Sequence, residues 1–203
     1  MSTPTTQQEP GAAISTVIAR NQAFAETGGH HGATPLATLR LFVVTCLDPR
    51  TDPAHLLGLR LSEAFIVRNV GGRVTDDVIA SVAFVAQIAE NISPDGEEPF
   101  FEVAIIHHNQ CGAMALADDG FRATYASRIG AEETELREHA VLDPRATVAV
   151  DVERLRQAAA IPSRVLVSGH VYDVTTGVLT TTISSGQAAA PSRAVRRRRA
   201  GSA

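Results

Sequence analysis

Three short apolar runs stand out in the first half of the chain, each bounded by polar or turn-forming residues. They are LRLFVVT at 39–45, AFIVR at 64–68 and FEVAIIHH at 101–108. Continuous runs that are rich in valine, isoleucine and phenylalanine are typical of strands buried on both faces, as in a parallel sheet. We therefore expect these three segments to be strands of one such sheet.

Helical patterns alternate with these runs. Residues 75–91 place Val78, Val82, Val85 and Ile88 on one face, and Thr75 can cap the first turn. Further helices are expected over 12–27 and 146–160, with shorter ones between 113 and 142. Alternating strands and helices predict an α/β fold, with a mostly parallel central sheet flanked by helices.

The last ordered pattern is a hairpin. Residues 164–183 read RVLVSGHVYDVTTGVLTTTI, which predicts a strand, a turn near 175–177 and a returning strand. The returning strand would add a C-terminal antiparallel edge strand to the sheet. We expect a single domain over 14–184, with a disordered N-terminus at 1–13 and a disordered basic tail at 185–203, which ends RAVRRRRAGSA.

Composition narrows the classes of protein to consider. The chain has 203 residues, of which 44% are hydrophobic and 20% charged, as in globular proteins. The formal net charge of -4 argues against nucleic acid as a partner of the folded body. No apolar run approaches the roughly 18 residues that span a bilayer, and the N-terminus lacks the features of a secretory signal. We therefore expect a cytoplasmic protein that binds no membrane.

The chain has only two cysteines, and each follows an expected strand. Cys46 ends the first run, while His108 and Cys111 end the third. Because ligands collect at the carboxyl ends of parallel strands, these side chains can converge if the two strands are neighbours. Two thiolates and one imidazole form a good zinc set that leaves one position open. The alternative is an ordinary core histidine with two buried, inert thiols.

Asp48 and Arg50 favour chemistry over that alternative, because they follow the first cysteine in a C-x-D-x-R pattern. Asp48 can occupy the fourth metal position and so close the site. It can instead pair with Arg50, remain ionised and accept a hydrogen bond from a metal-bound water. Taken alone, the two residues are also compatible with a surface ion pair.

Taken together, the motifs CLDPR at 46–50, VRNVGG at 67–72, HHNQCGA at 107–113 and VYDVTTGVL at 171–179 resemble the β-class carbonic anhydrases. The resemblance covers residues 39–183. It is strongest to the short actinobacterial-type branch, which also includes carbonyl sulfide hydrolases. It implies a β-carbonic anhydrase-like fold, one Zn²⁺ per subunit held by Cys46, His108 and Cys111, and Asp48 and Arg50 as a catalytic dyad. It further implies a homodimer or homotetramer.

The reaction implied by the resemblance is the reversible hydration of CO₂ to bicarbonate and a proton, by attack of zinc-bound hydroxide. Two alternatives remain open. The same site can hydrolyse carbonyl sulfide or carbon disulfide, or the protein can be a catalytically silent zinc-binding protein in which Asp48 is the fourth ligand. His107 stands where the family commonly has glycine, and it can be a proton shuttle or a packed residue of the strand.

Overall fold

The computed structural model describes residues 12–96 and 98–189. The chain divides after Pro35 into two compact units. The first unit contains helix α1 (Ala12–Glu26), which matches the helix expected over 12–27. The second unit, from Leu36 onward, contains all the other helices and strands described below. The single domain expected over 14–184 stays a prediction.

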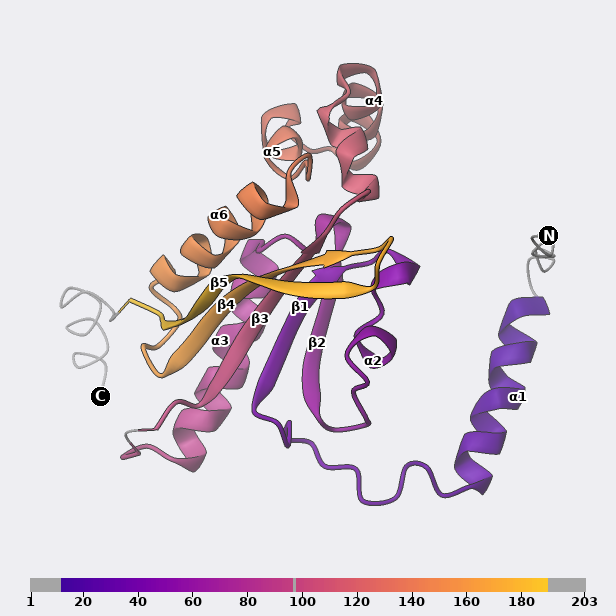
Figure 1. Cartoon of the computed structure of the whole chain (residues 1–203), viewed down its shortest axis with the longest axis vertical. Helices are drawn as coiled ribbons and strands as arrows, with labels where there is room; N and C mark the ends of the chain where they lie inside the picture. Colours follow the sequence, from indigo (N-terminus) through magenta and orange to yellow (C-terminus); the bar gives the residue numbers. More distant parts are fainter. Residues whose placement is uncertain (1–11, 97, 190–203) are drawn as a thin grey trace. The chain divides into compact units, whose positions relative to one another are not determined.

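The second unit is built on one five-stranded sheet with the order β2-β1-β3-β4-β5 (Figure 1). All neighbouring strands are parallel except β4 and β5, which are antiparallel. This architecture confirms the expected mostly parallel sheet with a C-terminal antiparallel edge strand. The strands are β1 (Leu41–Cys46), β2 (Ala64–Asn69), β3 (Phe101–His108), β4 (Val165–Asp173) and β5 (Val178–Gln187).

Helices connect the strands, and side chains cap the two longest helices of this unit. Thr75 accepts a hydrogen bond from the Val78 amide at the start of the first, and Asp143 accepts from the Arg145 and Ala146 amides at the start of the second. The helices are η1 (Pro49–Thr51), α2 (Pro53–Leu56), η2 (Val70–Gly72), α3 (Asp76–Ile92), η3 (Gly112–Ala117), α4 (Asp119–Ile129), α5 (Glu133–Glu138) and α6 (Pro144–Gln157).

Two element boundaries differ from the expected ones. Helix α6 begins two residues before 146, because Asp143 caps it and Pro144 fits the first helical turn. Strand β5 continues to Gln187, which lies beyond the expected domain boundary at 184, because its backbone keeps pairing with β4 as far as Leu166. Residues 1–11 and 190–203, where disordered ends are expected, lie outside the described residues.

The main core lies between one face of the sheet and helices α3 and α6. Phe42 and Val44 of β1 and Val103 and Ile105 of β3 share this face, because the register places Phe42 beside Val103 and Val44 beside Ile105. Figure 1 shows both helices running along the sheet. The core thus fixes β1 and β3 side by side, with their carboxyl ends at one edge.

Within the described residues, no helix is long and apolar enough to cross a membrane.

Candidate metal centre

Three side chains meet at the carboxyl ends of β1 and β3. Cys46 is the last residue of β1, His108 is the last residue of β3, and Cys111 follows one short turn later. Their sulfur and nitrogen ligand atoms all lie within 4.8 Å of one another, and all three residues are buried. The two sulfur atoms are 3.8 Å apart. This is the only such cluster of potential ligands among the described residues.

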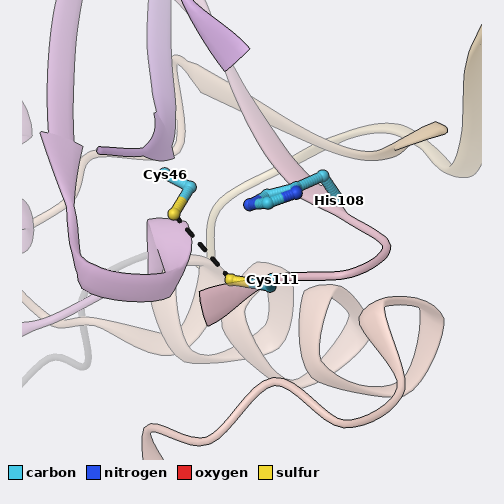
Figure 2. Close-up of side chains that lie close together, drawn as sticks. All are labelled: Cys46, His108 and Cys111. Atoms are coloured by element: carbon cyan, nitrogen blue, oxygen red, sulfur yellow. Dashed lines mark hydrogen bonds between the residues drawn. The ribbon is translucent and has the colours of Figure 1, made fainter. Parts of the chain in front are cut away.

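The donor atoms suit a metal ion. The Nδ1 atom of His108 donates to the Asn109 carbonyl oxygen at 2.8 Å, which leaves Nε2 as a bare acceptor. Nε2 is buried and has no hydrogen-bond partner among the described residues. Figure 2 shows the imidazole pointing toward the two sulfur atoms. A buried acceptor without a partner is costly, and a cation held between it and two thiolates would satisfy it.

Each of the two thiols affects the ionisation of the other. A hydrogen bond with the Cys111 thiol lowers the pKa of Cys46, and the nearby His108 imidazole and the Asp48 and Gly71 backbone amides act in the same direction. The same pairing with Cys46, together with burial, raises the pKa of Cys111. Ionising both sulfurs at 3.8 Å is unfavourable without a neutralising charge. A divalent cation supplies that charge, and soft thiolate ligands favour zinc among the common ions.

The turn between His108 and Cys111 is fixed by the β4–β5 hairpin. Asn109 donates through Nδ2 to an Asp173 carboxylate oxygen at 3.0 Å and accepts from the Val174 amide at 2.9 Å. Gln110 adopts a left-handed conformation with φ of 53°, which a non-glycine residue adopts only where its neighbours hold it. The hairpin therefore determines where the Cys111 sulfur lies relative to His108.

Asp48 and Arg50 lie beside the three ligands. Asp48 Oδ1 accepts from the Arg50 backbone amide at 2.9 Å and from Nε at 3.0 Å, and Oδ2 accepts from Nη2 at 2.7 Å. These hydrogen bonds lower the pKa of Asp48 to about 2, with the side-chain contact from Arg50 as the largest cause. Asp48 Oδ2 lies 4.0 Å from His108 Nε2. An ionised carboxylate thus lies beside the three side chains that could hold a metal ion.

Further contacts hold the segment that carries Asp48. Arg68 donates to the backbone oxygens of Cys46 and Asp48, at 3.0 and 2.7 Å, and pairs with Asp52 at 3.0 Å. Arg50 Nη2 also donates to the Gln110 carbonyl oxygen at 3.0 Å, which joins this segment to the turn before Cys111. The Asp48 carboxylate is therefore held in place through several backbone and side-chain contacts.

Comparisons with known proteins agree with this geometry. The model of the carbonic anhydrase family matches residues 41–179. The chain belongs to the β-class carbonic anhydrase family. It is 30% identical to β-carbonic anhydrase 1 of Mycobacterium tuberculosis over 155 residues, which cover 74% of this chain and 87% of that relative. It is 31% identical to a carbon disulfide hydrolase of Acidithiobacillus thiooxidans over 160 residues, which cover 69% and 75% of the two chains.

Solved structures confirm the β-carbonic anhydrase fold. The carbonic anhydrase of Streptococcus mutans superposes with a TM-score of 0.69 at 30% identity, covering 83% of this chain and 96% of that one. A carbon disulfide hydrolase superposes with a TM-score of 0.54 at 23% identity, which shows the shared fold. As a member of this family with such relatives, the chain is an enzyme. The relatives indicate two possible activities, that of a carbonate dehydratase and that of a carbon disulfide hydrolase.

A buried charged group that the sequence does not predict lies behind this centre. His107, for which the sequence is compatible with a proton shuttle or a packed residue, is fully buried and lies 3.1 Å from an Asp151 carboxylate oxygen. Asp151 in turn pairs with the buried Arg73 at 2.7 Å. One signal was present in the sequence, because Asp151 is a charged residue beside Val148, Val152 and Leu155 on the apolar face of α6.

Proposed function

We propose that this chain catalyses the reversible hydration of CO₂ to bicarbonate and a proton, at a zinc ion held by Cys46, His108 and Cys111. The observation that carries the proposal is the convergence of three buried ligand atoms beside an ionised Asp48. When bound, zinc supplies a water of lowered pKa and hence a nucleophile at neutral pH. The remaining roles fall to side chains of the chain itself.

Asp48 is proposed to accept a hydrogen bond from the nucleophile and so to orient it toward the CO₂ carbon. An ionised carboxylate can only accept hydrogen bonds, and the pKa of Asp48, which Arg50 lowers to about 2, keeps the group ionised at neutral and alkaline pH. Arg50 is a positioning residue in this scheme, because its contacts with both carboxylate oxygens hold Asp48 in one orientation. Its contact with the Gln110 carbonyl ties that orientation to the Cys111 turn.

The arrangement supports an open fourth metal position. Both carboxylate oxygens of Asp48 are already engaged by Arg50, so a bond from Asp48 to a metal would require giving up part of this pairing. A site that Asp48 closes permanently would have no use for the Arg50 side chain. We therefore place Asp48 as a hydrogen-bond acceptor and not as a ligand.

A second candidate function is hydrolysis of carbon disulfide or carbonyl sulfide at the same centre. The observation in its favour is the group of carbon disulfide hydrolases among the relatives, at an identity similar to that of the mycobacterial carbonic anhydrase. The same nucleophile can attack the carbon of any of these molecules. Access and shape along the path to the metal would then decide between the substrates.

The test is a stopped-flow CO₂ hydration assay on protein of measured zinc content, from neutral to alkaline pH, with carbonyl sulfide and carbon disulfide as parallel substrates. We expect CO₂ turnover that rises with pH and exceeds sulfide release. An Asp48→Asn variant that retains zinc tests the role of the carboxylate, and it should lose most of the CO₂ turnover. Fast sulfide release beside slow CO₂ hydration would instead assign the second function. The expected homo-oligomer and cytoplasmic location remain predictions.

A further inference from the structure

A buried polar network lies behind the metal centre, on the face of the sheet that packs against α6. Its central residue is His107, which precedes the ligand His108 and is fully buried. His107 Nδ1 lies 2.8 Å from the Thr147 hydroxyl, and Nε2 lies 3.2 Å from the Gly72 carbonyl oxygen and 3.1 Å from an Asp151 carboxylate oxygen. The network thus joins β3, the η2 turn and α6.

Both ring nitrogens of His107 and both carboxylate oxygens of Asp151 have polar partners in this network. Nε2 faces two acceptors, so it carries the proton and donates to Gly72 and Asp151. Asp151 also accepts from Arg73 Nε and Nη2 at 2.7 and 3.1 Å, and Arg73 donates to the Glu138 carbonyl. Hydrogen bonds from His107 and Arg73 lower the pKa of Asp151 against the opposing effect of burial. A charged group this deep is retained only where its partners hold it firmly.

The atoms held by this network are those that carry the metal ligands. Gly72 lies against the end of β1, so closely that an added Cβ would be 2.9 Å from the backbone nitrogen of Cys46. His107 fixes the last peptide of β3, and along a strand the next side chain, that of His108, points to the other face. A single imidazole therefore ties the backbone beside Cys46 to the backbone that carries His108.

We propose that His107, held by Asp151 and Thr147, is a positioning residue for the metal centre, which sets the separation of Cys46 and His108 through the Gly72 carbonyl. This inference rests on the metal site of the proposed function. It makes no use of a proton passing through His107. Its consequence is that loss of the network loosens the metal site, in addition to any loss of fold stability.

The test compares three full-length variants with the wild type, each loaded with Zn²⁺ or Co²⁺. His107→Leu approximately preserves the volume of the side chain and removes its contacts with Thr147, Gly72 and Asp151, whereas His107→Gln keeps a terminal amide that can donate to Gly72. Ser168→Ala is the matched control, because Ser168 is also a buried polar residue of the sheet but contacts Glu102 and His170 instead of this network. Readouts are the rate of metal release to a chelator, the cobalt absorption spectrum and the urea midpoint.

We expect His107→Leu to release zinc at least about tenfold faster and to change the cobalt d–d bands, as loss of an outer contact to a metal site generally does. His107→Gln should recover most of both properties, and Ser168→Ala should keep wild-type release despite a lower urea midpoint. If His107→Leu does not fold, Thr147→Val, which loses only the hydroxyl, should still speed release several-fold.

Three results would overturn the inference. The first is wild-type release and cobalt spectra in both His107→Leu and Thr147→Val. The second is faster release in Ser168→Ala to the same extent as in His107→Leu, because the effect would then follow fold stability alone. The third is a wild-type protein that binds cobalt without sulfur-to-metal charge transfer, which would remove the metal site and the proposed function with it. A failure of CO₂ turnover with normal cobalt spectra would count against the proposed function only.

Discussion

Substitution of Gly72 by alanine tests the closeness of the η2 turn to the metal centre. Gly72 has φ of 68°, in the left-handed region, and an added Cβ would lie 2.9 Å from both the Cys46 nitrogen and the Thr45 carbonyl carbon. That is about 0.5 Å closer than the 3.4 Å at which ordinary contact begins. Both neighbours are backbone atoms of β1, so relief requires the end of the strand to move.

Two effects add in this variant. Placing alanine in the left-handed region costs about 1–2 kcal/mol, and forcing an extra methyl group into packed surroundings costs about 1–3 kcal/mol more. Gly72→Ala should therefore lose about 2–5 kcal/mol of unfolding free energy. Gly130, with φ of 67° and no atom within 4 Å of its added Cβ, separates the two effects. Gly130→Ala should lose only the conformational part.

The assay is urea unfolding of the metal-free proteins, followed by zinc release to a chelator from the loaded ones. Movement of Cys46 should speed zinc release from Gly72→Ala, whereas Gly130→Ala should release zinc at the wild-type rate. The reasoning would be refuted if the two variants lost equal stability and retained zinc equally, because the end of β1 would then have room that the structure does not give it.

Three further predictions concern charge at the centre. Arg50→Gln should lower the turnover number for CO₂ about 100-fold while zinc content stays unchanged by elemental analysis; unchanged turnover would contradict the role of the dyad. The pKa of Asp48 is lowered to about 2 in the folded protein, so its stabilising contribution is present above about pH 4 and lost as pH falls toward 2, and a urea midpoint that does not fall over this range would contradict it. Because the pKa of Cys46 is lowered and that of Cys111 raised, Cd²⁺ binding at about pH 8 should release about one thiol proton instead of about two, measured by calorimetry in two buffers.

The sequence predicts the sheet and the three converging side chains for one physical reason. Strand ends are marked by the change from a β-branched run to polar residues, and parallel strands bring their carboxyl ends to a common edge. The position of Cys46 and His108 therefore follows once β1 and β3 are neighbours, as they are. The pairing of Asp48 with Arg50 is similarly local, since only Pro49 separates them and a 3₁₀ turn brings them together.

The contacts that hold the site in place could not be predicted from the sequence, because they depend on how segments distant in the chain pack against one another. Nothing in the sequence aligns Asp151 of α6 with His107 of β3, and nothing aligns Asn109 with Asp173 of the hairpin. The extension of β5 to Gln187 is not predictable from the sequence for a different reason. Residues 184–187 lack apolar alternation, and their strand conformation comes from pairing with β4, which is shifted at Gly169.

The charges at the centre give a reason for separating Asp48 from the ligands. In the proposed site, two thiolates and a neutral imidazole would already balance the charge of a zinc ion, so a directly bound carboxylate would make the centre anionic and oppose ionisation of a bound water. Arg50 offsets the charge of Asp48 and draws it aside, while leaving Oδ2 4.0 Å from His108 Nε2. Under the proposed function, the carboxylate would then orient a nucleophile without weakening it. The C-x-D-x-R pattern places the proposed acceptor and its counter-charge in the same turn, directly after the proposed ligand Cys46.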